Sequence, residues 1–540
     1  MDAQLFGAPA GPLPAETLRA ALDARVNDAR PWLIFQRGAG TPLTLTFADA
    51  AQLARRWAQA LRSAGVRAGD RVALLLPNGP DFIGAFFGVQ QICATPVPLP
   101  WPVVSMGPLV LPAGAAAVLA IAEPRVLVAP TAIEACPVPV LTPDAAVSGV
   151  GEQAEPQPSS SVGVDAALVA PAFIQFTSGS TGRPRGAIVS QRAAVHSAWA
   201  MGQALRLSTD DIGVSWLPFF HDMGLVGVVL SSLLAGFPVH VLTPAEFLLR
   251  PRRWLELLSS TRATITVAPN FAFDLVLRRA RTLFPSLDLS ALRFALNGSE
   301  PVLRATLAAF ATAGAEAKLR SGAVLPVYGL AENALGVTFQ AEGAPDADAP
   351  LDGRNVPSVG VPLPGMDVAV RRADGSLAQV GEEGEVTVKG AALMDGYLGD
   401  AEGTARALRA GWLWTGDRGL IVNGRLHLTG REKELVIKAG RKFHPADIEQ
   451  VVATLVDAPP NGVVAFSVLR ESAGGEELVI VAELRRRPTG DLVSQIRGKL
   501  SETLGVMADR IELVGAGDLP RTTSGKLRRA ECIARYGART

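Results

Sequence analysis

The spacing of hydrophobic and polar residues predicts alternating helices and strands up to about residue 360. Hydrophobic side chains recur at helical spacing over residues 48–65, and the continuous apolar run at residues 71–76 predicts a buried strand. Similar runs predict strands at residues 126–128, 213–216, 239–242, 263–267 and 292–296, with helices at 252–258 and 301–313. Because apolar strands that alternate with helices form parallel sheets covered by helices, we expect an α/β fold of mainly parallel sheets here.

The pattern changes twice in the remainder of the chain. Short strands joined by turns are predicted at about residues 360–430, where Asn423-Gly424 is a hairpin signal. From residue 431 the sequence predicts strands at 434–438, 463–469 and 477–484, with helices at 445–456 and 491–504. We therefore expect a large N-terminal domain, residues 1–430, that includes a small β-barrel-like subdomain at about 360–430. A small α+β C-terminal domain, residues 431–540, follows it.

One long stretch without charge needs a separate interpretation. Between Asp81 and Glu123 no residue is charged, which would allow a membrane-spanning helix by length. Six prolines interrupt this stretch, and prolines at that density break helices: Pro96, Pro98, Pro100, Pro102, Pro108 and Pro112. We expect a buried helix to about Ala94, a proline-rich loop and a short alanine-rich helix, and therefore no membrane span.

Charge and cysteine content exclude some classes of protein. The chain has 51 Lys and Arg residues and 51 Asp and Glu residues, so a nucleic-acid-binding surface is not indicated. Cys93, Cys136 and Cys532 lie far apart and fit neither a disulfide framework nor a zinc site. The first residues lack the basic start and apolar core of a signal peptide. We therefore expect a cytoplasmic protein.

A loop rich in glycine and hydroxyl groups follows the apolar run at residues 172–175. It consists of Thr177, Ser178, Gly179, Ser180, Thr181 and Gly182. Glycine lets backbone N–H groups turn toward one point and hydroxyl groups add donors there, which suits a phosphate. The loop lacks the Walker pattern Gly-x-x-x-x-Gly-Lys-Ser/Thr. By itself, a loop of this composition is more often a surface linker, so other motifs must decide.

Five motifs in order resemble those of the adenylate-forming superfamily, which includes acyl-CoA ligases, fatty acyl-AMP ligases, nonribosomal adenylation domains and luciferases. After the loop come Pro-Val-Tyr-Gly-Leu-Ala-Glu at 326–332, Trp-Thr-Gly-Asp at 414–417, Gly-Arg-Glu-Lys at 430–433 and Pro-Arg-Thr-Thr-Ser-Gly-Lys at 520–526. The resemblance implies ATP and Mg²⁺ as cofactors and a reaction in two steps. A carboxylate attacks the α-phosphate of ATP to give an acyl-adenylate and pyrophosphate, and the acyl group then passes to a thiol.

The resemblance also implies roles for individual residues. Lys526, Glu332 and Arg185 would be catalytic, with Glu332 as the magnesium ligand and Arg185 where many members have lysine. The loop 177–182 would hold the β- and γ-phosphates, and Asp417 and Arg431 would bind the ribose. Residues expected around the adenine and α-phosphate are Asn297, Gly298, Ser299, Tyr328, Gly329 and Ala331. Lys433 would be the hinge of a mobile C-terminal domain. Outside these motifs, Glu332 or Lys526 would be a solvated charge and Tyr328 a core residue.

The segment 216–225 resembles fatty acyl-AMP ligases more than typical acyl-CoA ligases. It reads Trp-Leu-Pro-Phe-Phe-His-Asp-Met-Gly-Leu, and residues 268–274 and Ala331 point the same way. We expect the substrate-binding residues to be His221, Asp222, Met223 and Phe271, with an acyl tunnel walled by residues 226–233 and 271–275. The alternative for His221 is a core histidine with satisfied hydrogen bonds.

The acceptor of the acyl group is the open question. Fatty acyl-AMP ligases carry an insertion after the adenine motif that disfavours coenzyme A, and the corresponding residues 338–359 are shorter than that insertion. We expect a fatty or other carboxylic acid as substrate and a separate acyl carrier protein as partner, because the chain ends 14 residues after Lys526. An acyl-CoA synthetase is the alternative, and an adenylate-binding protein without catalysis is a further one.

Overall fold

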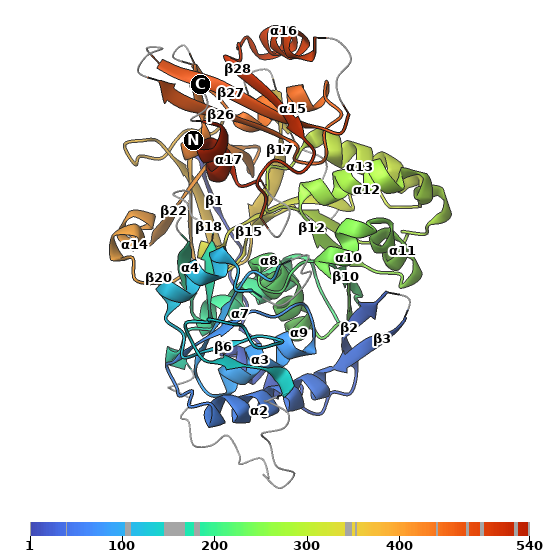
Figure 1. Ribbon diagram of the computed structural model, residues 1–540, viewed down its shortest axis with the longest axis vertical. Helices are drawn as coiled ribbons and strands as arrows, with labels where there is room; N and C mark the ends of the chain where they lie inside the picture. The colour runs from blue at the N-terminus through green and yellow to red at the C-terminus, as the bar shows by residue number, and fades with distance from the viewer. Residues whose placement is uncertain are drawn as a thin grey trace.

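The computed structural model describes residues 2–38, 40–102, 110–144, 168–177, 184–340, 348–351, 354–438, 441–470, 475–486, 491–522 and 527–537. In Figure 1 most of the blue and green segments lie in the lower part and the red C-terminal segments lie at the top, while the N-terminus itself lies in the upper part beside α17. The predicted loop residues 178–182 and Lys526 lie outside the described residues, as does most of the Ser- and Pro-rich stretch before the loop.

Among the described residues, the largest sheet has 16 strands, of which six neighbouring ones form a parallel region, called here the parallel half. Strand β10 (Gly213–Ser215) lies between β11 (Val239–Val241) and β12 (Ile265–Ala268), and all are parallel. The parallel half is completed by β2 (Pro31–Arg37), β13 (Phe294–Asn297) and β14 (Val324–Gly329). Its edge strand β3 (Gly40–Thr46) is antiparallel to β2. The parallel sheet predicted from the apolar runs is thus confirmed.

The other half of this sheet is antiparallel. It begins at β14 and continues through β15 (Gly336–Phe339), β17 (Arg354–Pro362), β23 (Arg425–Arg431), β22 (Trp412–Val422), β19 (Gly384–Gly390), β18 (Met366–Arg371) and β1 (Gln4–Phe6). Strand β16 (Asp348–Leu351) pairs with β17, and β21 (Leu408–Arg409) pairs with β22. The predicted β-rich region therefore begins earlier, at β15, and is continuous with the parallel half. At the β22–β23 hairpin, Asn423 and Gly424 have φ of 51° and 71°, as its turn requires.

Two smaller sheets complete the N-terminal part. One has the order β5 (Thr95–Pro98), β4 (Arg71–Leu74), β6 (Val126–Val128), β7 (Val140–Leu141), and the other has β20 (Gly396–Tyr397), β9 (Arg185–Val189), β8 (Phe173–Thr177). The helices of this part are α1 (Leu18–Asp23), α2 (Phe47–Ser63), α3 (Pro80–Gln91), α4 (Ala113–Ala122), α7 (Gln191–Ala204), α8 (Asp222–Gly224), α9 (Ser231–Ala235), α10 (Pro244–Leu249), α11 (Arg252–Ser260), α12 (Asn270–Ala280), α13 (Arg304–Glu316) and α14 (Ala401–Ala407).

The predicted amphipathic helix at 48–65 is α2, and local chemistry defines its start. Thr46 accepts a hydrogen bond from the backbone N–H of Asp49, whose carboxylate accepts from the backbone N–H of Thr46, which is a capping box. Trp57 on its buried face packs against α3. A Cβ at Gly84 of α3 would lie 2.4 Å from Trp57 Cδ1, so glycine allows the two helices to approach closely.

The prediction of a loop after Ala94 is wrong at its start, because Thr95–Pro98 form strand β5. This strand pairs with β4 at an edge of its sheet. Thr95 and Leu99 donate backbone N–H groups to Asp70 and Leu74, whereas Pro96 and Pro98, which lack the N–H, fall on the alternate positions. Proline at every second residue of an edge strand is compatible with pairing on one side.

The C-terminal part has a hydrophobic cluster of its own, which includes Ile448, Val452, Ile480 and Ile496. It contains the sheet β26 (Val463–Arg470), β27 (Gly475–Leu484), β28 (Arg510–Gly515) and the hairpin β24 (Val436–Lys438), β25 (Arg441–Phe443). Its helices are α15 (Pro445–Ala453), α16 (Leu492–Leu504) and α17 (Arg529–Tyr536). The α+β arrangement predicted for this part is confirmed.

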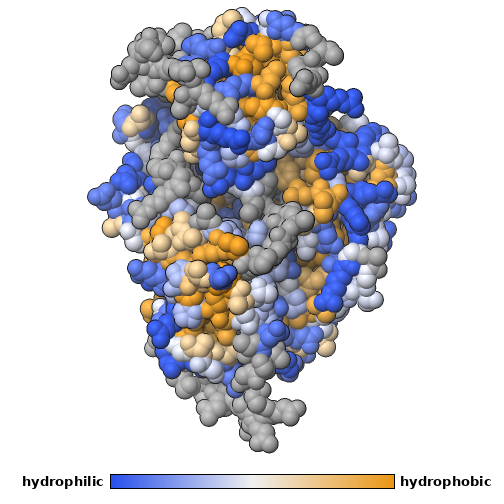
Figure 2. Space-filling view, in the orientation of Figure 1, coloured by the Kyte–Doolittle hydropathy of each residue, from blue (hydrophilic) through white to orange (hydrophobic). Residues whose placement is uncertain are grey.

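The face drawn in Figure 2 shows hydrophobic residues in separate patches, one over the C-terminal part and another in the lower half of the view, with hydrophilic residues between them. Among the described residues, no helix combines the length and the apolar character needed to span a bilayer. The uncharged stretch from Asp81 contributes α3, which is 12 residues long and buried over most of its length.

Glu383 connects the antiparallel half of the large sheet to the C-terminal part. It accepts hydrogen bonds from Thr429 and from Arg418 Nη2 (3.1 Å), and His444 Nε2 lies 3.3 Å away. Burial alone would raise the pKa of Glu383, but the hydrogen bonds of His444 and Thr429 and the charge of Arg418 together lower it to about 2.

We expect Glu383→Gln to make stability less dependent on pH. The pKa of Glu383 is lower in the folded than in the unfolded protein, so its contribution is complete above about pH 4.5 and is lost as the pH falls toward about 2. The variant should unfold more easily at neutral pH, by at most about 3 kcal/mol, and the difference should shrink below about pH 4. Denaturant titrations at several pH values measure this. Glu382→Gln, which removes an exposed pair with Arg372, is the control.

Candidate active site

A cavity of about 1510 Å³ lies where the carboxyl ends of the parallel strands meet the antiparallel half of the sheet and the C-terminal part. Ser215 from β10, Tyr328 from β14 and Asp417 from β22 line it, together with Glu449 from α15. Ligands of open α/β sheets bind at the carboxyl ends of the strands. The cavity is therefore the candidate active site.

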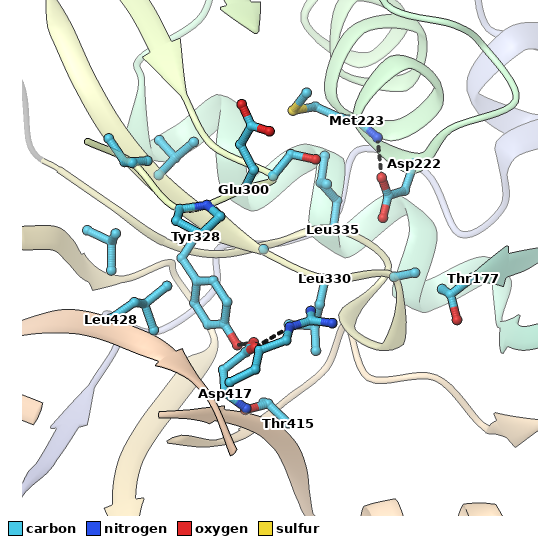
Figure 3. A pocket seen from close by; sticks show the side chains of 18 of the residues that line it. Thr177, Asp222, Met223, Glu300, Tyr328, Leu330, Leu335, Thr415, Asp417 and Leu428 are labelled. Atoms are coloured by element: carbon cyan, nitrogen blue, oxygen red, sulfur yellow. Dashed lines mark hydrogen bonds and ion pairs between the residues drawn. The ribbon is translucent and has the colours of Figure 1, made fainter. Parts of the chain in front are cut away.

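One end of the cavity is built around Asp417. The Tyr328 hydroxyl donates to Asp417 Oδ2 at 2.7 Å, and Arg431 Nε donates to Oδ1 at 2.9 Å, as Figure 3 shows for the tyrosine and the carboxylate. Burial, followed by the charge of Asp417, raises the pKa of Tyr328. Each carboxylate oxygen has a second lone pair, so this group can still accept hydrogen bonds from a ligand.

The turn after β14 brings Glu332 to the cavity. A Cβ at Gly329 would lie 2.3 Å from Leu335 O, so only glycine permits this tight reversal into β15. The turn closes with a 2.8 Å hydrogen bond from Leu330 N–H to Leu335 O and contains the short helix η3 (Ala331–Asn333). Ala331 and Glu332 both line the cavity.

Tyr397 is a site residue that the sequence analysis missed. Its hydroxyl donates to Glu332 Oε1 at 2.8 Å, and the guanidinium carbon of Arg185 lies 5.3 Å from the centre of its ring. Burial raises the pKa of Glu332. The chain has only three tyrosines, and two of them, Tyr328 and Tyr397, line the cavity. The small number of tyrosines was the one feature of the sequence that could have drawn attention to Tyr397.

Glu332 fits one metal ion in particular. Among the described residues no group of three or more His, Cys, Asp or Glu side chains could hold a metal. If a phosphate-bearing ligand binds in this cavity, a single carboxylate would suit Mg²⁺, which keeps waters and takes substrate phosphates as ligands. Zinc, in contrast, requires a dedicated set of protein ligands.

The strands on both sides of the predicted phosphate loop end at the cavity. Thr177 of β8 pairs with Arg185 of β9 in the antiparallel register, and both residues line the cavity. The loop between them therefore starts and ends at this site, although residues 178–182 themselves are outside the described residues.

Only part of the segment 297–300, which was predicted to line the adenine site, lines the cavity. Ser299 and Glu300 line the cavity, but Asn297 does not. Asn297 is fully buried, and its Nδ2 donates to Asn270 Oδ1 at 3.1 Å. A Cβ at Gly298 would lie 2.7 Å from Val327 Cγ2, so this glycine serves the close packing of β13 on β14.

His221, Asp222 and Met223, which the sequence predicts to bind the substrate, line the cavity. His221 Nδ1 lies 2.6 Å from Asp222 Oδ1, and the His221 side chain is 26% exposed, so it is not a fully buried core histidine. It precedes the short helix α8, which continues as the π-helix η1 (Leu225–Leu230) and then α9. Such π-helical turns are frequent at functional sites.

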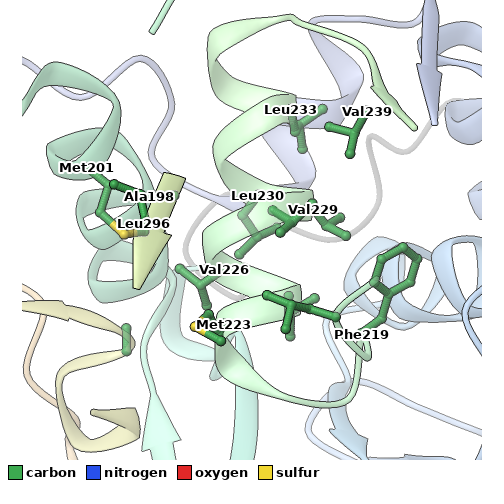
Figure 4. Packing of buried hydrophobic residues seen from close by; sticks show 14 of the residues in the cluster. Ala198, Met201, Phe219, Met223, Val226, Val229, Leu230, Leu233, Val239 and Leu296 are labelled. Atoms are coloured by element: carbon green, nitrogen blue, oxygen red, sulfur yellow. The ribbon is translucent and has the colours of Figure 1, made fainter. Parts of the chain in front are cut away.

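From His221 the cavity continues as an apolar compartment between α7, η1 and the parallel strands. Its apolar lining consists of Met201, Leu205, Leu207, Val214, Val228, Phe237, Val239, Ile265, Val267 and Leu296. Figure 4 shows Met201 and Leu296 beside the helix that carries Val226, Val229 and Leu230. Gly227, Val228 and Ser231 line the cavity, so part of the predicted wall at 226–233 lies there.

The prediction for the second wall, residues 271–275, is not supported by the structure. Phe271 is not among the described residues that line the cavity. It is 5% exposed, and its ring packs edge-on against Trp216 with centroids 5.8 Å apart. Trp216 in turn stacks on Phe247, so the aromatic core holds Phe271 away from the cavity. We correct its assignment from substrate-binding to core residue.

The C-terminal part closes the cavity from the other side. Thr522 and Leu527 both line it, and these residues are the described neighbours of the segment that contains Lys526. Lys433 belongs to the short helix η4 (Glu432–Glu434), where the chain passes from β23 into the C-terminal part.

The family model described as AMP-binding enzyme matches residues 22–398, and the chain therefore belongs to this family. In fold and class it is an adenylate-forming enzyme. A solved structure from a study of fatty acyl-adenylate ligases from E. coli and L. pneumophila has a TM-score of 0.85 and 29% identity, covering 97% of this chain and 98% of the other.

Two curated relatives are similar over most of their length. The long-chain-fatty-acid–AMP ligase FadD23 of Mycobacterium tuberculosis is 33% identical, with 87% of this chain and 86% of the relative covered. A Caulobacter vibrioides protein named provisionally as an acyl-CoA synthetase is 32% identical, with 91% and 89% covered. Both names describe enzymes that activate acyl groups.

Proposed function

We propose that this protein is a fatty acyl-AMP ligase, which activates a fatty acid with ATP and passes the acyl group to a separate acyl carrier protein. One observation carries the proposal. A single cavity joins the polar end at Tyr328, Asp417 and Glu332 to the apolar compartment beyond His221. The polar end suits a nucleotide and the apolar compartment suits an acyl chain. The fatty acyl-AMP ligase and adenylate ligase relatives support this pairing.

In the first step a carboxylate oxygen of the acid attacks the α-phosphorus of ATP. The bond between the α-phosphorus and its bridging oxygen breaks, and pyrophosphate leaves. Arg185 and Lys526 stabilise the negative charge that spreads over the phosphates, while Asp417 and Arg431 bind the ribose. Glu332 would hold Mg²⁺, which neutralises phosphate charge when bound. The protein contributes position and charge and needs no covalent intermediate of its own.

In the second step the thiol of a phosphopantetheine group loses its proton to solvent and its sulfur attacks the acyl carbon. The bond between that carbon and the phosphate oxygen breaks, and AMP leaves. We infer that residues 431–540 form a mobile unit that turns about Lys433 between the two steps. The hydrophobic cluster of this part, separate from the large core, supports this division. The absence of a paired cysteine spacing supports a reducing, cytoplasmic location.

An acyl-CoA synthetase is the second candidate, which the name of the Caulobacter relative favours. Mass spectrometry of the purified protein with ATP, Mg²⁺ and a panel of fatty acids tests both. Parallel reactions contain coenzyme A or a phosphopantetheinylated carrier protein. Acyl-AMP that transfers only to the carrier supports the proposed function, whereas acyl-CoA at a comparable rate assigns the protein to the synthetases.

We expect Gly227→Leu to shorten the acids that the enzyme accepts. Gly227 and Leu335 both line the cavity, and a Cβ at Gly227 would lie 3.0 Å from Leu335 Cδ2, so a leucine side chain there either fills cavity space itself or pushes Leu335 aside. Each methylene excluded from an apolar site costs about 0.8 kcal/mol, so kcat/KM for the longest acids should fall roughly tenfold or more. Competition between acids of different length measures this. Gly498→Leu, at a site with open space in α16, is the control, and an unchanged length profile would contradict the prediction.

A further inference from the structure

The loop that carries His221 into the cavity is held by two side-chain amides from distant parts of the chain. Asn78, between β4 and α3, donates from Nδ2 to Leu217 O at 2.8 Å and accepts from the Phe219 N–H at Oδ1, also at 2.8 Å. Gln175 of β8 donates from Nε2 to Phe220 O at 3.1 Å. We refer to residues 217–221 as the histidine loop.

The histidine loop makes little regular backbone structure of its own. Its internal backbone hydrogen bond runs from His221 N–H to Pro218 O at 3.2 Å. The loop folds tightly onto α8, where a Cβ at Gly224 would lie 2.1 Å from Pro218 O. Ser215 Oγ accepts from Leu217 N–H at 3.1 Å and His221 O accepts from Leu225 N–H at 2.8 Å, so both ends of the loop also have local bonds. The bonds from Asn78 and Gln175 are the ones that reach the loop from distant elements, and they satisfy backbone groups that no sheet or helix pairs.

Gln175 also connects two parts of the site. It lies two residues before Thr177, and Gln175, Thr177, His221 and Asp222 line the same cavity. Its Oε1 is buried without a hydrogen-bond partner among the described residues. A buried amide oxygen without a partner lowers stability, so packing alone does not account for glutamine at this position.

We propose that Asn78 and Gln175 are positioning residues that hold His221 and Asp222 at the junction between the nucleotide end and the acyl compartment. Through this loop they set where the carboxylate of the fatty acid meets the phosphates. The inference rests on the proposed function, because it assigns the histidine to acid binding. A displacement of about 1 Å at a reacting group is enough to cost on the order of 10²-fold in rate.

Asn78→Asp and Asn78→Ala test whether Asn78 positions the histidine loop. The aspartate keeps an acceptor for Phe219 N–H but sets an oxygen against Leu217 O, and the alanine removes both bonds. For each we expect kcat/KM for the fatty acid to fall about ten- to a hundredfold, with KM for ATP changed less than about twofold. Gln175→Leu should also lower kcat/KM for the fatty acid.

Gln191→Ala is the matched control. Gln191 is also a buried amide with two bonds, since it accepts from Leu18 N–H at 3.0 Å and donates to Gln90 Oε1 at 2.7 Å, and it is not among the described lining residues. Its loss should lower the melting temperature without changing the ratio of the two KM values. An equal loss for acid and ATP in Asn78→Ala would overturn the proposal.

A double-mutant cycle with His221→Ala separates positioning from stability. If Asn78 acts through His221, Asn78→Ala should change kcat/KM for the acid less than about twofold in the His221→Ala background. Additive effects, or a His221→Ala variant with full activity, would overturn the positioning role while the fatty acyl-AMP ligase function stands. A wild-type protein that forms no acyl-AMP would overturn both.

Discussion

Lys526→Ala should reduce formation of acyl-AMP by roughly 10²- to 10³-fold, with ATP binding nearly unchanged. This is the loss expected when a cation that stabilises charge in the transition state is removed. ATP should still bind because Tyr328, Asp417 and Arg431, the proposed nucleoside-binding residues, are intact. The expectation rests on the lysine motif and on Thr522 and Leu527, which line the cavity on either side of it.

The anchor of this segment is a strong ion pair. Arg521 Nη2 lies 2.6 Å from Glu483 Oε2 and donates to Asn461 O at 2.9 Å, and Glu483 is fully buried. Asn461 in turn donates to Glu300 Oε2 at 3.2 Å, which links the C-terminal part to the nucleotide end. In this orientation of the C-terminal part, these bonds place the start of the lysine segment close to the cavity.

Pyrophosphate release, and acyl-AMP detected by mass spectrometry, measure how far Lys526→Ala slows the reaction. Equilibrium binding of ATP tests the second part of the prediction, that the variant still binds ATP. Lys499→Ala, an exposed lysine of the same part paired with Glu502, is the control. Near-normal pyrophosphate release by Lys526→Ala would remove this lysine from the mechanism.

Glu332→Gln should raise the concentration of Mg²⁺ needed for half-maximal activity and lower the maximal rate by roughly 10²-fold. The estimate follows from the several kcal/mol that a metal contributes when it neutralises phosphate charge. Glutamine keeps the shape and an acceptor for the Tyr397 hydroxyl, so the local structure should persist. The loss is then one of charge rather than of folding.

Magnesium titrations of the initial rate, with direct Mn²⁺ binding in the presence of ATP, test this role of Glu332. Glu502→Gln, an exposed carboxylate in α16, is the control. A Glu332→Gln variant whose magnesium response and Mn²⁺ affinity match the wild type would exclude the carboxylate as a ligand.

Sequence reasoning succeeded where the evidence is local. The apolar run at residues 126–128 is β6, the amphipathic pattern at 48–65 is α2, and the Asn423-Gly424 turn joins β22 to β23. In each case the residues that decide the structure are neighbours in the sequence. It failed at β5, where the alternation of Pro96 and Pro98 is compatible with one-sided pairing that only a partner strand reveals.

Within the candidate site, the sequence identified the residues that belong to contiguous motifs. It did not identify the residues outside those motifs that other elements bring to the site. Tyr328 and Asp417 are 89 positions apart, and each stood in a recognisable motif. Tyr397 lies 65 positions from its partner Glu332, and Asn78 lies 139 positions from its partner Leu217. Neither Tyr397 nor Asn78 belongs to a motif, so the sequence did not indicate these contacts. The assignment of Phe271 failed because Trp216 and Phe247 determine which way its ring packs.

The sequence by itself determined the class of protein and many of its helices and strands, and it placed the candidate site residues in recognisable motifs. These depend on periodicity and on short motifs, whose physical basis is local backbone conformation and capping. Only the tertiary structure decided which side chains share one cavity, how the acyl compartment joins the nucleotide end, and which amides hold the histidine loop. Those relations are set by packing between elements far apart in the chain, where a hydrogen bond or an aromatic contact leaves no periodic trace in the sequence.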